Sequence, residues 1–216
     1  AAHLLIIFLA IESVSLVSYL LVGLQKFDKR SSESALKYVL FGAVSSAVML
    51  FGMSLLFGIT GSVSLIEIGN YLSTAPLQAQ AAGRISLVLV LVGVGFKISV
   101  VPFHMWAPDV YQGAATPITA FLTVAPKALG FAVMARIWFV AVPQMATQWA
   151  PLLGGLAMLT MTLGNVIAIS QSDVKRLLAY SSIAQAGYIL AGLSMRTSLG
   201  LDAVLIYVAA YLFTNL

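Results

Sequence analysis

The sequence predicts an all-α fold, a polytopic bundle of transmembrane helices, on two observations. Of its 216 residues, 61% are hydrophobic and 8% are charged, and the mean hydropathy is +1.02. A soluble domain is about 25% charged, so 11 Lys and Arg with 7 Asp and Glu cannot cover a water-facing surface. The apolar residues also fall into runs near the length of about 20 residues that a membrane-spanning helix needs, whereas the strands of a membrane barrel are half as long and alternate in polarity.

Seven apolar runs follow one another along the chain. They cover residues 3–24, 35–58, 84–104, 116–141, 150–171, 176–195 and 201–216. The longest connection, 59–83, is predicted to be a loop, and Thr116 before Pro117 reads as a helix N-cap. Because no linker or low-complexity segment divides the chain, 1–216 is predicted to be one transmembrane domain. Both ends fall in or beside apolar runs, so we expect a part of a longer polytopic protein.

The basic residues of the connections predict an orientation in the membrane. The connections after the first, third and fifth runs hold Lys26, Lys29, Arg30, Lys175 and Arg176, and the opposite side holds only Arg84, Arg196 and Arg136. Cytoplasmic loops carry the excess of Lys and Arg. We therefore expect loops 25–34, 105–115 and 172–175 to lie on the cytoplasmic, negative side.

The composition also excludes several classes of function. The absence of cysteine excludes disulfides, thiolate metal sites and a cysteine nucleophile. The sequence has no HExxH motif and no phosphate-binding loop, and His3 and His104 alone do not form a haem-binding pattern. The basic residues behind the net charge of +4 are spread between apolar runs, which disfavours a nucleic-acid surface. The chemistry that the sequence supports is the movement of charge.

Three ionisable residues are predicted near the middle of the membrane. At 1.5 Å per residue, Glu12 lies about 14 Å and Lys97 about 20 Å from the outer ends of their helices, and Lys127 about 17 Å from an inner end. A charge at this depth costs several kcal/mol and usually faces the bundle interior with a functional role. The three residues predict a polar axis across an otherwise apolar bundle.

Two prolines and a histidine lie beside this axis. Pro102 and Pro126 each lack the N–H of a regular helix and free a carbonyl in the turn before, which is tolerated at this depth only inside protein or facing water. His104 follows Lys97 by seven residues, so on a continuous helix the two would share nearly one face. Imidazole takes up and releases protons near neutral pH.

Structural roles remain open for several of these residues. Glu12 could lock helix packing through Ser13 or Ser15, Lys37 could reach the interface by its long side chain, and His104 could be an interfacial anchor. The remaining charged residues have simpler expected roles: Glu33 favours a helix N-terminus, Asp109 forms a turn, and Asp173, Lys175 and Arg176 form a solvated turn.

One segment resembles a known family closely. Residues 95–114 read GFKISVVPFHMWAPDVYQGA, and this run resembles the N-type (subunit 2) antiporter-like membrane subunit of respiratory complex I, the proton-pumping NADH:quinone oxidoreductase. The likeness continues through PITAFL at 117–122, APK at 125–127, ESALKY at 33–38, DVKRLLAYSSI at 173–183 and GY at 187–188. The related M-type subunit usually reads Leu-Pro-Asp-Ala-His after the tryptophan, and Mrp-type sodium–proton antiporter subunits share the pattern more loosely.

The resemblance implies a fold and a set of site residues. It implies fourteen helices built from two inverted five-helix repeats, of which the seven runs would match helices five to eleven. Glu12 would pair with Lys97 of a broken helix, and Lys127 would continue a hydrated proton path. Lys37 matches the lysine of the family's helix six and His104 the histidine of its helix seven, with His104 expected on or near the path towards the cytoplasmic side.

The resemblance also implies partners and leaves alternatives. The partners would be other membrane-arm subunits of complex I, lipid and protons, in a bacterial plasma membrane or an organelle inner membrane. No cofactor is expected in this chain, while NADH, FMN, iron–sulfur clusters and quinone would belong to partner subunits. Two departures are the missing broken helix twelve and Pro126, where serine is common. The alternatives are an Mrp-type cation–proton antiporter subunit and a non-conducting structural module.

Overall fold

The computed structural model describes residues 2–215, and this part of the chain is almost entirely helical. The helices are α1 (Leu4–Val22), α2 (Lys29–Thr60), α3 (Leu65–Thr74), α4 (Leu77–Ile98), α5 (Ala107–Gly113), α6 (Thr116–Arg136), α7 (Ala146–Ile169), α8 (Val174–Ser194) and α9 (Ser198–Asn215). A π-helical turn, Ile137–Ala141, extends α6, and a short 3-10 turn, Pro143–Met145, precedes α7. Seven of these segments are long and apolar enough to cross a membrane, which confirms the predicted all-α, multi-pass fold.

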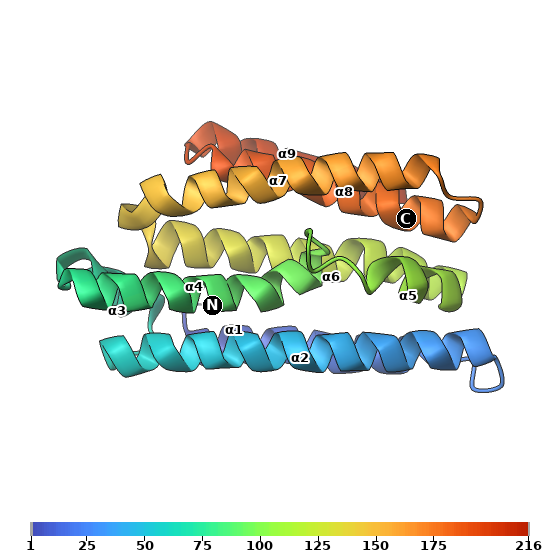
Figure 1. Ribbon diagram of the computed structural model, residues 1–216, viewed down its shortest axis with the longest axis horizontal. Coiled ribbons are helices and arrows are strands. Elements are labelled where there is room, and N and C mark those ends of the chain that lie inside the picture. Colours follow the sequence, from blue (N-terminus) through green and yellow to red (C-terminus); the bar gives the residue numbers. More distant parts are fainter. Residues whose placement is uncertain (1, 216) are drawn as a thin grey trace.

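The long helices lie side by side along one axis (Figure 1). α1 and α2 form one side of the bundle, α4, α5 and α6 the middle, and α7, α8 and α9 the other side. Large apolar side chains such as Leu20, Ile169 and Phe213 remain exposed on the outside. An apolar exterior is expected where helices face lipid tails or other membrane helices rather than water.

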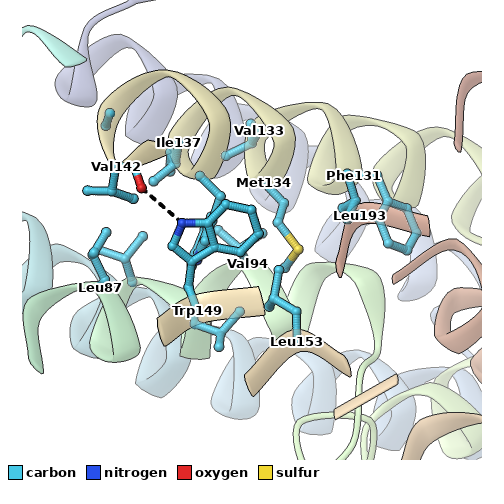
Figure 2. Packing of buried hydrophobic residues seen from close by; sticks show 14 of the residues in the cluster. Leu87, Val94, Phe131, Val133, Met134, Ile137, Val142, Trp149, Leu153 and Leu193 are labelled. Atoms are coloured by element: carbon cyan, nitrogen blue, oxygen red, sulfur yellow. Dashed lines mark hydrogen bonds between the residues drawn. The ribbon is translucent and has the colours of Figure 1, made fainter. Parts of the chain in front are cut away.

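An apolar cluster fills one end of the bundle, and Figure 2 shows it around Trp149. The indole Nε1 of Trp149 donates a hydrogen bond to the carbonyl oxygen of Val142 at 2.9 Å, where the chain turns between α6 and α7. Met134 and Leu153 pack beside the ring. The same carbonyl also accepts the N–H of Met145 at 3.1 Å, so the indole holds the turn between α6 and α7 against the apolar cluster.

The predicted loop 59–83 is wrong, because the structure places α3 and the first turns of α4 there. α3 buries Leu65, Ile68 and Leu72, which share one helix face at the spacing of three and four residues. The polar residues between them, which suggested a loop, lie on its outer face. A ten-residue helix with one polar face is too short, and too polar in sequence, to be recognised as an apolar run.

The predicted single helix over 84–104 is also wrong. α4 ends at Ile98, Ser99 takes a left-handed conformation with φ of 60°, and turns lead to α5 at Ala107. Pro102 explains the break, because proline has no N–H to donate and disfavours a helical conformation in the residue before it. His104 therefore does not share a helix face with Lys97.

The three loops expected on one side do meet at one end of the bundle. The Lys37 ammonium of α2 pairs with Asp109 of α5 at 2.8 Å, and the Gln112 amide donates to Asp173 before α8 at 3.0 Å. α2 begins at Lys29, six residues before the apolar run, because the Asp28 carboxylate accepts the N–H of Arg30 at 2.9 Å as an N-cap.

Candidate functional site

The break between α4 and α5 lies inside the bundle (Figure 1). Side chains bond two backbone groups at the break: Trp106 Nε1, at its far end, donates to the Phe96 carbonyl oxygen at 2.9 Å, and the Val101 N–H donates to Thr160 Oγ1 of α7 at 3.1 Å. Irregular backbone at membrane depth is stable only when its polar groups find such partners. The break is therefore a fixed element of the fold.

Lys97 lies in the last turn of α4, immediately before the break. Its side chain is 1% exposed, and Nζ donates a hydrogen bond to Ser15 Oγ of α1 at 2.8 Å. The C-terminal end of a helix carries partial negative charge that favours a cation. The break thus supplies Lys97 with an electrostatic environment that a continuous helix would not give.

Glu12 lies one turn before Ser15 on α1, beside the Lys97 contact. Its carboxylate accepts a hydrogen bond from Ser46 Oγ of α2 at 2.5 Å. Within residues 2–215, Glu12 and Lys97 form no direct ion pair, so the predicted pairing is not made in this arrangement. The Lys97 ammonium is instead bound by Ser15, three residues after Glu12 on α1.

Lys127 of α6 is buried to 2% exposure, and the described residues give its ammonium no carboxylate partner. Nζ donates to the Ser182 carbonyl oxygen of α8 at 2.9 Å and also to Ser182 Oγ, and it lies 6.0 Å from the centre of the Tyr111 ring. Tyr111 in turn donates its hydroxyl to the Leu122 carbonyl oxygen at 3.4 Å, the carbonyl that Pro126 leaves free. The ammonium is held by neutral groups and an aromatic face.

The structure brings Lys97 and Lys127 onto facing helices. Gly130, one turn after Lys127, lies against α4: a Cβ at this position would clash with Ile98 Cγ2 and lie 3.6 Å from the Cβ of Lys97. The absent side chain lets α4 and α6 approach closely. This contact between Gly130 and the end of α4 agrees with the expectation that Lys97 and Lys127 lie at a similar depth in the bundle.

His104 lies in the turns of the break and is half-buried. Its Nδ1 is buried and has no hydrogen-bond partner among the described residues. It is placed between the Lys97 end of α4 and the charged end of the bundle, but not on the same helix face as Lys97. Across residues 2–215, no three His, Asp or Glu side chains gather in a way that could hold a metal ion.

Lys37 belongs to a cluster of charges at the end of the bundle where α5 lies. Its ammonium pairs with Glu33 at 2.7 Å and with Asp109 at 2.8 Å, and Arg176 of α8 pairs with the other Asp109 oxygen at 2.6 Å. Burial raises the pKa of the Asp109 carboxyl, but the hydrogen bonds from Lys37 and Arg176 outweigh it and hold the pKa below its usual range. Asp109 thus joins α2, α5 and α8.

Predicting a simple turn at Asp109 and a solvated turn at 173–176 was therefore wrong. Asp173 caps α8 by accepting the Arg176 N–H at 3.0 Å, and Lys175 donates to the Ala114 carbonyl oxygen at 2.7 Å. The Arg176 N–H and the Gln112 amide hold the pKa of Asp173 below its usual range. A carboxylate shortly after a helix break, at the end with most basic residues, was the sequence signal that could have indicated this cluster.

Two further polar residues were not singled out from the sequence. Ser182 receives the Lys127 ammonium, and its Oγ lies 2.8 Å from the hydroxyl of Tyr211 on α9. A serine and a tyrosine within apolar runs carry no charge, so neither composition nor motif spacing marks them.

Comparisons with known proteins agree with this architecture. The profile of the family described as NADH:quinone oxidoreductase/Mrp antiporter, TM, matches residues 1–216. NADH-quinone oxidoreductase subunit N 2 of Sorangium cellulosum is 49% identical over 99% of this chain, and NAD(P)H-quinone oxidoreductase subunit 2 of a Synechococcus species is 50% identical over all of it. The chain spans 44% and 41% of these two relatives.

Solved structures show the same fold. A chain of respiratory complex I from Thermus thermophilus with bound aureothin is 39% identical, with a TM-score of 0.79 over 100% of this chain and 46% of its own length. A chain of the Mrp complex from a Dietzia species is 22% identical with a TM-score of 0.90, covering 99% of this chain and 40% of its own, and shows the shared fold alone. On the match over its whole length, this chain belongs to the transmembrane family of NADH:quinone oxidoreductase and Mrp antiporter subunits.

Proposed function

We propose that this chain is part of the proton-translocating N-type membrane subunit of an NADH:quinone oxidoreductase. The identity of about half to relatives with that name supports the assignment. The observation that carries the proton-transfer role is the pair of buried lysines, Lys97 and Lys127, on facing helices beside a helix break. Their bonded partners are neutral, so each can change its protonation without leaving a bonded carboxylate unpaired.

Glu12 is proposed to control the charge of Lys97. An ammonium and a carboxylate about 4 Å apart attract by roughly 4 kcal/mol at an effective dielectric constant of 20, which is nearly three orders of magnitude in proton affinity. If the carboxylate leaves Ser46 and approaches Nζ, the proton is retained on Lys97. When it returns to Ser46, the proton is released towards Lys127, so one swinging side chain loads and unloads the site.

His104 and Lys37 complete the proposed path. His104 lies between Lys97 and the charged end of the bundle, and its half-buried imidazole can take up and release a proton near neutral pH. Lys37 borders a cavity of about 200 Å³ that is also lined by Asp109 and Gln112, and this cavity is the proposed entrance from the cytoplasmic, negative side. The driving movement would come from membrane-arm partner subunits, with NADH, FMN, iron–sulfur clusters and quinone held elsewhere in the complex.

An Mrp-type cation–proton antiporter subunit is the alternative. The matching family includes both classes, and the folds are the same. Identity separates them, since the named quinone oxidoreductase relatives reach 49% and 50% and the Mrp chain 22%. The alternative predicts a sodium- or potassium-dependent proton flux in the absence of an electron donor.

The test compares Lys97→Arg and Lys97→Ala in the assembled complex. Arginine keeps the positive charge but does not release a proton in the physiological range. In membrane vesicles, both variants should assemble and translocate fewer protons per electron passed from NADH to quinone. Lys26→Ala, a lysine exposed outside the bundle, is the matched control and should pump normally. Native pumping by Lys97→Arg would show that Lys97 is an electrostatic element and not a proton carrier.

A further inference from the structure

We propose that Ser182 and Tyr211 form a hydroxyl relay that carries protons from Lys127 to helix α9. The proposal rests on the proton-transfer role of Lys127 proposed above, and it extends the path sideways through the bundle. It concerns the direction in which a proton leaves the second buried lysine.

Ser182 joins a buried lysine to a second hydroxyl group through its side-chain oxygen. Four buried serines of α1, α2 and α4 donate their hydroxyl to the carbonyl four residues earlier, and one of them, Ser15, also accepts the Lys97 ammonium from α4. The four are Ser15, Ser18, Ser45 and Ser86. Ser182 Oγ accepts from Lys127 Nζ of α6 and lies 2.8 Å from the Tyr211 hydroxyl of α9. One hydroxyl thus connects three helices.

Tyr211 provides the next step of the chain. The buried residues of α9 are Gly200, Val204 and Tyr211, so the Tyr211 hydroxyl is the polar side-chain group on its buried face. Tyr211 is itself buried, at 7% exposure. Either oxygen of the Ser182–Tyr211 pair can be the donor, and a relay needs this freedom because each hydroxyl must accept one proton as it gives up another.

The transfer conserves atoms and charge. An N–H bond of the Lys127 ammonium breaks as its proton passes to Ser182 Oγ, and the hydroxyl proton of Ser182 passes to the Tyr211 oxygen. The original hydroxyl proton of Tyr211 passes to a water molecule beyond it. Lys127 becomes a neutral amine, both hydroxyls are intact, and rotation of the two O–H bonds resets the relay.

The experiment measures protons translocated per electron in vesicles that contain the assembled complex. Tyr211→Phe and Ser182→Ala each remove one hydroxyl and should lower the ratio as far as Lys127→Ala lowers it. The double variant with Lys127→Ala and Tyr211→Phe should be no lower than Lys127→Ala alone. A purely structural defect would instead lower the amount of assembled complex and add to the effect of Lys127→Ala.

Tyr207→Phe is the matched control. Tyr207 lies one turn earlier on α9, and its hydroxyl bonds Gln185 of α8, away from Lys127. It should keep the native ratio. If Lys127→Ala lowers the ratio while Tyr211→Phe and Ser182→Ala keep it, the relay is refuted and the proposed function stands. If all three keep the native ratio, the proton-carrying role of Lys127 fails, and the relay fails with it.

Discussion

The helices that carry the two buried lysines pack closely at Gly130, and a single methyl group added there is a sensitive test of the site. In Gly130→Ala, the added Cβ would overlap Ile98 Cγ2 and reach within 3.6 Å of the Lys97 Cβ. Ile98 is fully buried and is the last residue of α4, so it has no room to move away. α4 must therefore shift relative to α6.

The expected loss of stability in Gly130→Ala follows from two opposing effects on the free energy of unfolding. Overpacking a close-packed interior costs typically about 1–3 kcal/mol, while replacing a mid-helix glycine by alanine returns about 0.5–1 kcal/mol of backbone entropy. The net destabilisation should therefore lie between about 0 and 2.5 kcal/mol, which leaves the subunit folded. The displaced Lys97 should lose its 2.8 Å bond to Ser15, so proton translocation should fall more than stability does.

Gly155→Ala is the matched control, because a Cβ at Gly155 of α7 meets nothing within 4 Å. The assay is thermal unfolding of the purified complex, read together with protons translocated per electron in vesicles. Gly130→Ala should lower both quantities and Gly155→Ala neither. A Gly130→Ala complex with native pumping and native thermal stability would refute the view that this contact sets the position of Lys97.

Two further predictions concern carboxylates. Asp109→Asn should weaken the ion pairs of α5 with Lys37 and Arg176, by no more than about 1 kcal/mol for each pair because they are partly exposed and screened by salt. Since the pKa of Asp109 is lowered in the folded state, its stabilisation of the native protein should be complete above the unfolded pKa of about 3.9 and should be lost as pH falls through the lower folded pKa. Unfolding measured against pH at low and high salt should therefore show a loss of stability in acid that the variant lacks, and an identical acid profile in the variant would contradict the prediction. Glu12→Gln keeps a hydrogen-bond acceptor for Ser46 but removes the charge, so assembly should be native while protons per electron decrease; an unchanged ratio would remove Glu12 from the mechanism.

Much of the architecture follows from the sequence because lipid imposes length and polarity on each span. Seven apolar runs predicted seven spanning segments, and the cost of a buried charge pointed to Lys97 and Lys127, which the structure places on facing helices. Their roles in proton transfer, and the cytoplasmic side of the bundle, stay predictions.

The features that the sequence did not predict depend mostly on contacts between residues far apart in the chain, and less on the local sequence pattern. The residues after Ile98 are as apolar as those before it, so apart from the family resemblance, which implied a broken helix, only Pro102 indicated that the helix stops. Asp109 looked like a turn residue because its partners, Lys37 and Arg176, are 72 and 67 residues away in the chain. The same holds for the Ser182 hydroxyl, whose importance arises from groups on two other helices.

The bonds at the break in α4 separate what is fixed in this subunit from what can move. Trp106, Thr160 and Asp109 tie the two halves of the interrupted helix to each other and to α7, α2 and α8. Flexing the break would require several of these hydrogen bonds to open together, at about 1 kcal/mol each. Rotating Glu12 or a serine hydroxyl exchanges one hydrogen bond for another at little cost. The proposed proton transfer can therefore be fast and reversible if the backbone stays fixed and only side chains move to change the protonation of Lys97.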